Sequence, residues 1–318
     1  MITKHDSSLL IVNYHYVRDR NQYPYPGIHP VGREEFIRQV HWLKSRYHMA
    51  TAEEVESFAY GEEPLPAPSI FLTFDDGLAE HVKLAAEILD PLGIKAAFFV
   101  STMPLIENHA LMVHKIHWLR ATMDPEQFRE QFTGLLTDKW RQALLNDKTG
   151  VEALRAYPYD TPQNARLKYL INHKLPPKIA DAAGSEMLTS RGISEAAFCE
   201  KTYMNQTHIR NLSEKGHVIG SHGHSHAPFS GLDSEALKNE LKTGISFLGK
   251  TTGLRPRWIS YPYGMRWSIS EDTDKLCRDL GFTIGLGLDK DAWGWNTGEE
   301  SPLWLKRINT NEVNKFAH

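Results

Sequence analysis

The sequence predicts an α/β fold, either a parallel sheet or a (β/α) barrel. Short runs of β-branched and aromatic residues alternate with amphipathic helical stretches over most of the 318-residue chain, as is typical of strand–helix repeats. Three of the apolar runs lead into polar segments, at 73–77, 220–226 and 260–264. Because active sites of parallel α/β folds collect at the carboxyl ends of strands, these segments are the first candidates for a functional site.

The individual elements follow from local patterns. Phe36, Val40 and Leu43 recur at spacings of three and four residues, which places them on one helix face. Thr51 and Glu54 form a capping box that starts a short helix. Helices are expected at 33–47, after Thr51, between 78 and 93, and at 207–216, 234–249 and 272–280. Strands are expected at 9–16, 70–74, 95–100, 217–221, 258–261, 282–288 and 304–308.

The segment at about 105–200 breaks this alternation. It has helical patches at 115–121, 126–136 and 140–145, many charges and few strand signals. A structureless loop of that length would be unusual inside a compact domain. We therefore expect one domain over 1–318, interrupted by a mostly helical insertion.

Composition excludes several classes of protein. The chain has 36 Lys and Arg against 39 Asp and Glu, a formal net charge of −3, and 41% hydrophobic residues. These values are typical of a soluble globular protein and exclude a disordered chain or a collagen-like repeat. The near-neutral charge argues against a nucleic-acid partner.

The sequence predicts a cytoplasmic protein. Its two cysteines, Cys199 and Cys277, cannot form a disulfide framework, which favours a reducing compartment. The apolar stretch at 9–12 is too short for the core of a signal peptide. No run approaches the roughly 20 apolar residues of a membrane-spanning helix.

Two adjacent carboxylates, Asp75 and Asp76, end the apolar run at 70–74. Neighbouring residues of a strand point to opposite sides, so the two side chains are expected to have different partners. Burying them is costly unless a cation lies beside them. The alternative is a simple turn, since Asp-Asp-Gly is common in turns.

Three histidines, His222, His224 and His226, occupy five consecutive positions after another apolar run. Neutral imidazole is the commonest metal ligand in proteins. Two imidazoles and one carboxylate, with open positions for water, suit a catalytic zinc ion or another first-row divalent ion. The alternative is a polar loop whose histidines bind nothing.

The third segment, Ser260-Tyr261-Pro262-Tyr263-Gly264, again closes an apolar run. Its turn can expose backbone N–H groups toward a developing oxyanion. Without further context it also fits an ordinary turn with aromatic packing.

Together the three segments resemble the polysaccharide deacetylase family, the NodB-homology domain of carbohydrate esterase family 4. The TFDDG motif of that family is present at 73–77, the paired histidines of its second motif at 222 and 226, and its P-Y-G sequence at 262–264. The resemblance covers about 70–100 and 205–310 and leaves 105–200 outside it. It implies a distorted (β/α) barrel.

The resemblance also implies a set of roles. Asp76, His222 and His226 would hold one divalent metal ion, with zinc as the first candidate and cobalt, nickel, manganese or iron as alternatives. Asp75 would be the general base that deprotonates the attacking water. The backbone N–H of Tyr263 would stabilise the oxyanion.

Two positions depart from the family pattern. Ser260 stands where the family has an arginine that pairs with the catalytic aspartate, and Arg307 stands where it has a histidine that protonates the leaving amine. We hypothesise that Arg307 restores the ion pair with Asp75. The acid must then be another residue, and His224 and His15 are the candidates.

Three further residues are expected to contact the substrate. They are Tyr261, Trp293 and His15. Trp293 belongs to an Asp-Ala-Trp triplet at 291–293 that resembles the fourth motif of the family, whose tryptophan lines the site. Flat aromatic rings suit the faces of sugars, although such residues often belong to a core.

The predicted function is a metal-dependent hydrolase that removes N-acetyl groups, or O-acetyl groups, from an N-acetylated saccharide in surface-glycan metabolism. Within the enzyme class, the alternative is a deacylase or amidohydrolase that acts on a non-glycan amide. Outside it, the alternative is an inactive relative that binds metal or saccharide.

Overall fold

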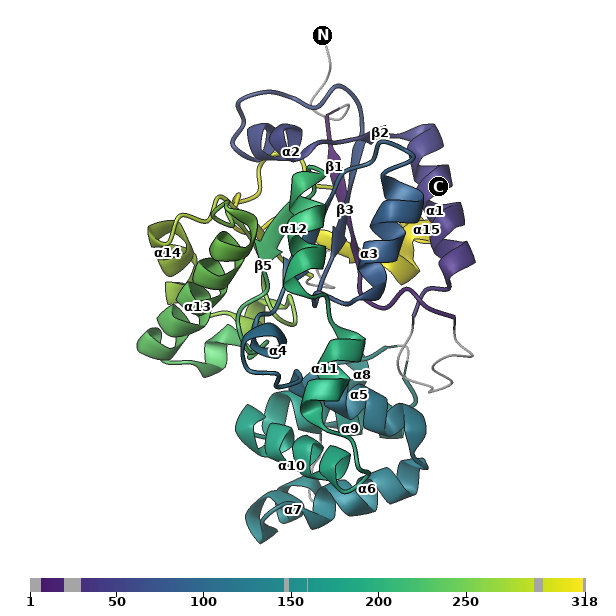
Figure 1. The fold of residues 1–318 in the computed structure, drawn as a ribbon, viewed down its shortest axis with the longest axis vertical. Coiled ribbons are helices and arrows are strands. Elements are labelled where there is room, and N and C mark those ends of the chain that lie inside the picture. Colours follow the sequence, from purple (N-terminus) through teal and green to yellow (C-terminus); the bar gives the residue numbers. More distant parts are fainter. Residues whose placement is uncertain (1–6, 20–29, 146–148, 159, 289–293, 317–318) are drawn as a thin grey trace. The chain divides into compact units, whose positions relative to one another are not determined.

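The computed structural model describes residues 7–19, 30–145, 149–158, 160–288 and 294–316 (Figure 1). These residues form two compact units. The barrel unit comprises Met1–Val17, Val31–Ile106 and Thr202–His318, and the helical unit comprises Arg18–Pro30 and Glu107–Lys201. The assignment of 1–318 to a single domain stays a prediction.

A parallel sheet forms the centre of the barrel unit. Its strands follow the order β7-β6-β5-β4-β3-β1-β8, with β2 paired to β3 outside this path. The strands are β1 (Leu9–Tyr14), β2 (His48–Met49), β3 (Ser69–Phe74), β4 (Ala96–Val100), β5 (Val218–Ser221), β6 (Trp258–Ser260), β7 (Ile284–Leu286) and β8 (Arg307–Asn309). The backbone of Leu305, just before β8, bonds to Gly285 and Gly287 at 2.9 and 3.0 Å. The sheet thus nearly closes, and the predicted distorted barrel is confirmed.

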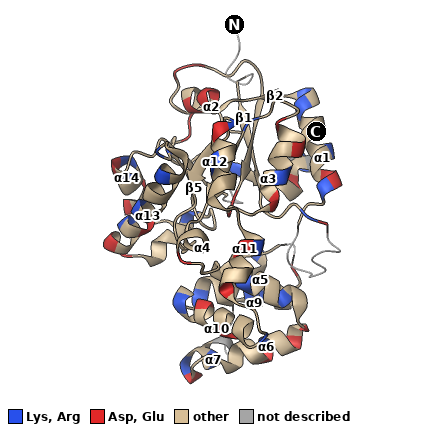
Figure 2. Ribbon diagram, viewed as in Figure 1, with Lys and Arg blue, Asp and Glu red and all other residues tan. Residues whose placement is uncertain are grey.

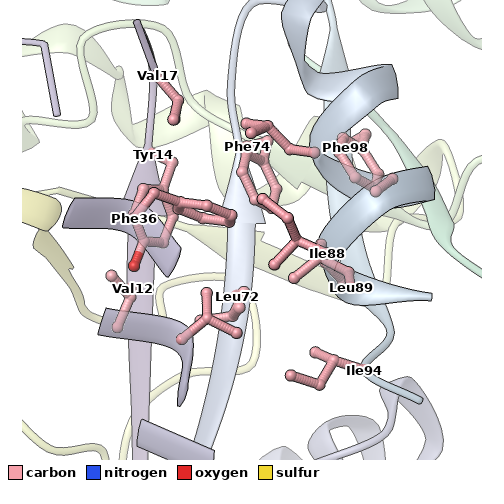
Figure 3. Packing of buried hydrophobic residues seen from close by; sticks show 14 of the residues in the cluster. Val12, Tyr14, Val17, Phe36, Leu72, Phe74, Ile88, Leu89, Ile94 and Phe98 are labelled. Atoms are coloured by element: carbon pink, nitrogen blue, oxygen red, sulfur yellow. The ribbon is translucent and has the colours of Figure 1, made fainter. Parts of the chain in front are cut away.

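The central strands are buried along their whole length. Every residue of β1, β3 and β4 lies in the interior, which explains why these strands appear in the sequence as continuous apolar runs rather than as alternating patterns. Figure 3 shows side chains of β3 packed between those of β1 and the segment at 88–89. The ring of Phe74 stacks on Tyr14 and on Phe98, with centroids 5.3 and 4.9 Å apart.

Helices surround this sheet in the barrel unit (Figure 1). They are α1 (Arg33–Arg46), α2 (Ala52–Ala59), α3 (Glu80–Leu84) with the π-helix η2 (Ala85–Leu89), α4 (Met103–Ile106), α12 (Gln206–Glu214), α13 (Ser234–Thr252), α14 (Glu271–Asp279) and α15 (Val313–Phe316). The predicted capping box of Thr51 and Glu54 is present at the start of α2. The two-residue strand β2 is too short for the sequence pattern to predict.

The helical unit has no strand among its described residues. Its helices are α5 (Met112–Thr122), α6 (Pro125–Gly134), α7 (Asp138–Leu145), α8 (Gly150–Ala156), α9 (Pro162–Tyr169) with the π-helix η3 (Leu170–Lys174), α10 (Pro177–Thr189) and α11 (Glu195–Thr202). Fully buried Lys115 links three of them, because its Nζ lies 2.7 Å from Asp181 Oδ1, 2.8 Å from Ser185 Oγ and 3.2 Å from Glu195 Oε1.

Charged residues of both signs are interspersed over the helices of each unit (Figure 2). This distribution agrees with the small net charge of the chain. None of the described helices is long and apolar enough to cross a lipid bilayer.

Candidate active site

The predicted site residues come from strands that neighbour one another in the barrel. Asp75 and Asp76 follow β3, His222 follows β5, and Ser260 ends β6. Arg307 begins β8 in register with Ile11. The closed arrangement of parallel strands therefore brings together residues that lie more than 200 positions apart in the sequence.

Asp76, His222 and His226 form one tight cluster. The Nε2 atoms of His222 and His226 lie 3.3 and 3.4 Å from the same carboxylate oxygen, Oδ1 of Asp76. All three side chains are buried, and their ligand atoms lie within 4.8 Å of one another. Within the described part of the chain, no other group of three such residues meets this criterion.

This cluster fits a divalent ion. Metal bonds of about 2.0–2.1 Å in a tetrahedral site separate the ligand atoms by about 3.3–3.4 Å, which matches the two measured distances. Nδ1 of His222 bonds to the backbone oxygen of Ser260 at 2.8 Å. Such a bond fixes the tautomer that turns the Nε2 lone pair toward the metal position.

The electrostatics of the cluster favour a cation. Burial disfavours protonated His222, but the carboxylates of Asp75 and Asp76 outweigh this effect and raise the pKa of His222 above its ordinary value. The surroundings therefore draw positive charge to this position. A divalent ion supplies such charge, and it requires the histidine to be neutral.

Backbone strain is concentrated at the site. Among the described residues, four that are not glycine have a positive φ, and three of them are Asp76, His226 and Tyr263, at 76°, 60° and 66°. Such a conformation costs on the order of 1–3 kcal/mol and persists only where the surroundings enforce it. The barrel thus holds two metal-ligand candidates, Asp76 and His226, in backbone conformations that such residues seldom adopt. The same is true of Tyr263, whose backbone N–H is the expected oxyanion donor.

Asp75 lies next to this cluster and pairs with Arg307. Nη1 and Nη2 of Arg307 donate to Oδ1 and Oδ2 of Asp75 at 3.0 and 2.9 Å, a bidentate ion pair. Both side chains are almost completely buried. The ion pair that we hypothesised is therefore present in the structure.

Three polar side chains complete the surroundings of this ion pair. Oδ2 of Asp75 also accepts from Asn13 Nδ2 at 3.0 Å and from Ser260 Oγ at 3.1 Å. Nη1 of Arg307 lies 3.3 Å from the hydroxyl of Thr73. Ser260 thus stays in the network although it replaces the arginine of the family pattern.

Sequence reasoning gave no role to Asn13 or to Thr73, although Thr73 begins the TFDDG segment. Both are fully buried, and each is a polar residue in an otherwise apolar strand, LLIVNY for β1 and SIFLTF for β3. A buried polar group needs a partner, so this interruption of the apolar run is the signal that could have identified them.

The remaining predicted residues lie in different surroundings. His15 is 36% exposed, with Nε2 3.9 Å from Oδ2 of Asp75. His224 is not a member of the metal cluster, and its Nδ1 bonds to Thr102 Oγ1 at 2.9 Å. The ring of Tyr263 packs on that of His226, with centroids 5.1 Å apart.

Two further residues, Tyr261 and Trp293, were predicted to contact the substrate. Tyr261 is fully buried, its hydroxyl donates to the backbone oxygen of Leu303 at 2.8 Å, and its ring stacks on Trp304. It is therefore a core residue, and its assignment to the substrate site is wrong. Trp293 lies outside the described residues.

The nearly closed parallel barrel with this acid–histidine cluster defines a deacetylase-type fold. The sequence model for polysaccharide deacetylases matches residues 62–133 and 177–285, more than half of the chain. The protein belongs to the polysaccharide deacetylase family. The match extends into 105–200, so the prediction that this whole segment lies outside the family pattern is wrong.

Individual relatives support the same assignment. The chain is 28% identical over 76 residues to a peptidoglycan-N-acetylglucosamine deacetylase of Bacillus cereus, a match that covers 24% of this chain and 26% of that protein. The structure of IcaB from Ammonifex degensii has a TM-score of 0.57 at 16% identity, covering 98% of this chain and 96% of that one. Streptococcus pyogenes deacetylase PplD, in complex with acetate, has a TM-score of 0.58 at 16% identity, covering 96% and 92%. At this identity the structures show a shared fold.

Replacing Arg307 with Gln should destabilise the protein in a pH-dependent way. Burial disfavours ionised Asp75, but the guanidinium of Arg307 holds the pKa of Asp75 well below its usual range. The ion pair therefore stabilises the fold above the unfolded pKa of about 3.9, and this contribution is lost as the pH falls further. We expect urea unfolding at pH 7 to show a loss of about 3–5 kcal/mol, and the loss should shrink as the pH falls below about 4.

The matched control is Arg38→Gln, which removes an exposed arginine paired with Glu35 on α1. It should change the free energy of unfolding by less than about 1 kcal/mol at any pH. Equal stability of Arg307→Gln and the unmodified protein at pH 7 would contradict the importance of the buried ion pair.

Proposed function

We propose that this protein is a metal-dependent deacetylase that hydrolyses the N-acetyl group of an N-acetylated saccharide and releases acetate. The observation that carries the proposal is the convergence of Asp76, His222 and His226 beside an ionised Asp75 at the strand ends of the barrel. Membership of the polysaccharide deacetylase family supports the reaction class.

The metal site of the proposal consists of Asp76, His222 and His226, with zinc as the first candidate. A bound divalent ion polarises the acetyl carbonyl and lowers the pKa of water toward neutrality. The one carboxylate and two imidazoles form a donor set that suits such an ion and leaves positions open for water and substrate.

Asp75 acts as the general base in this proposal. It stays ionised at neutral pH because Arg307 holds its pKa low. From the part of the chain that the structure describes, Oδ2 accepts three hydrogen bonds, whereas Oδ1 accepts one, from Arg307. A carboxylate oxygen can accept about two, so Oδ1 is the atom that takes a proton from the attacking water.

The proton for the leaving amine comes from His15 in this proposal. The water oxygen attacks the acetyl carbon, the carbon–nitrogen bond breaks, and the amine takes up the proton that His15 gives. His15 is partly exposed and lies next to Asp75, whereas Nδ1 of His224 is bonded to Thr102. The backbone N–H of Tyr263 stabilises the negative oxygen before the bond breaks.

An exposed aromatic ring supports a saccharide as the substrate. Trp267 is 44% exposed, and its ring lies 5.9 Å from that of Tyr263, which in turn packs on His226. A large flat ring that remains exposed next to Tyr263, which itself contacts a metal-ligand candidate, suits the apolar face of a sugar. A role in surface-glycan metabolism and a cytoplasmic location stay predictions.

Acetate release from N-acetylated chito-oligosaccharides tests the proposed function. The purified protein should release acetate, a chelator should abolish the release, and added zinc should restore it. Asp75→Asn should keep its metal by elemental analysis and lose turnover by a factor of about 10² or more, since it lacks the base. The surface variant Asp272→Asn on α14 should behave like the unmodified protein.

Three outcomes would contradict this assignment. Loss of the metal in Asp75→Asn would mean that the roles of the two aspartates are reversed. Turnover of simple acyl amides without turnover of the saccharide would indicate an amidohydrolase. Metal binding without turnover of any substrate would indicate a binding protein.

A comparison of two histidine variants tests the source of the proton. His15→Asn should lower the rate on the amide by about 10²–10⁴ and spare an acetyl ester whose leaving group needs no proton. His224→Asn should retain most of the activity on both substrates. The reverse ranking of the two variants on the amide would overturn the assignment of His15.

A further inference from the structure

A buried carboxylate holds the loop that joins the two histidines of the metal cluster. Glu240, on α13, is only 8% exposed. Its Oε1 accepts hydrogen bonds from the backbone N–H groups of His224 and Ser225 at 2.7 and 2.6 Å. Its Oε2 accepts from the hydroxyl of Ser225 at 3.0 Å. Consecutive N–H groups that converge on one oxygen form the kind of concave site that suits an anion.

The position of Glu240 on its helix is unusual. The buried residues Leu237, Leu241 and Leu248 define the apolar stripe of α13, and Glu240 lies on that stripe. A charged residue on the buried face of a helix is costly unless it is paired. Here the three hydrogen bonds from the loop satisfy the carboxylate, so the sequence irregularity has a specific structural counterpart.

Two glycines allow helix and loop to approach this closely. A Cβ atom at Gly223, which has a φ of +73°, would lie 2.8 Å from Oε1 of Glu240. A Cβ atom at Gly244, one turn further along α13, would lie 3.0 Å from Oγ of Ser221. Both distances are shorter than an ordinary van der Waals contact, so larger residues at these positions would push α13 away from the loop.

Residues 101–103 hold the loop as well. The carbonyl of His222 accepts from Ser101 Oγ at 2.9 Å, and that of His224 accepts from the N–H of Met103 at 2.9 Å. Glu240 is therefore the group from α13 that fixes the two residues directly before His226. Since His226 has a left-handed backbone with a φ of 60°, its orientation depends on what holds its neighbours.

We propose that Glu240 is a positioning residue that presents His226 to the metal ion through hydrogen bonds to the 224–225 backbone. The inference rests on the proposed metal site of Asp76, His222 and His226. Removing the carboxylate takes the acceptor from two partly buried N–H groups and removes the hydrogen bonds between α13 and the loop before His226. Loss of a hydrogen bond that orients a metal ligand typically lowers the affinity for the metal by about 10–100-fold.

Metal binding by the whole protein tests this role directly. Zinc affinity should be measured by competition with a chromogenic chelator, and the visible spectrum of the cobalt-substituted protein should report ligand geometry. Glu240→Ala should bind zinc about 10–100-fold more weakly and show an altered cobalt spectrum. Glu240→Gln keeps an acceptor for the two N–H groups and should restore most of the affinity.

The control and the opposing results separate this inference from the proposed function. Glu235→Ala, at an exposed position of the same helix, should bind zinc normally. Unchanged affinity and an unchanged cobalt spectrum in Glu240→Ala would overturn the inference, as would Glu240→Gln binding as weakly as Glu240→Ala. Failure of the unmodified protein to bind zinc would instead overturn the metal site itself.

If Glu240→Ala does not fold, Glu240→Asp provides the test. Its shorter side chain withdraws the carboxylate from the N–H groups of His224 and Ser225, which Oε1 of Glu240 now holds at 2.7 and 2.6 Å. Weaker zinc binding by Glu240→Asp, together with near-normal binding by Glu240→Gln, would support the positioning role. Zinc binding by Glu240→Asp as tight as that of the unmodified protein would overturn it.

Discussion

Two adjacent buried carboxylates at the end of β3 need positive charge, and the barrel meets this need differently for each. Asp75 receives the guanidinium of Arg307 in a bidentate ion pair. Asp76 faces two imidazoles whose nitrogens lie 3.3 and 3.4 Å from one of its oxygens. Both residues lie just after the end of β3, and Asp76 has a left-handed backbone with a φ of 76°. One short turn can therefore supply both an ionised base and a metal-ligand candidate.

The site keeps a positive charge beside Asp75 although Ser260 and Arg307 differ from the family pattern. Ser260 cannot form an ion pair, but it donates to Asp75 and accepts from Arg307. Instead, the guanidinium of Arg307, the first residue of β8, provides the positive charge beside Asp75 in the interior of the barrel. An arginine there cannot give up a proton at neutral pH, so the acid of the proposed reaction comes from the end of β1. The rearrangement keeps the charge balance of the site while changing which strands provide it.

Local patterns predicted the elements that are continuous in the sequence. Buried strands such as β3 and β4 are apolar runs, and the Thr51 capping box marks the start of α2. The site was predictable where the spacing of residues within one short motif is itself the signal, as for the histidines at 222 and 226. Asn13 and Glu240 were missed because their partners lie 62 and 15–16 positions away, and only the register of β1 on β3 and the close packing of α13 bring them together. Tyr261 was misassigned since an aromatic residue beside a motif can equally belong to the core.

The central claim is that Asp76, His222 and His226 share one divalent ion. The most direct test is a crystal structure of the zinc-loaded protein with diffraction data collected on both sides of the zinc absorption edge. The account predicts one strong anomalous peak bonded to Oδ1 of Asp76 and to Nε2 of each histidine. An ion bound elsewhere, or these three side chains bonded to one another with no anomalous peak at saturating zinc, would contradict it.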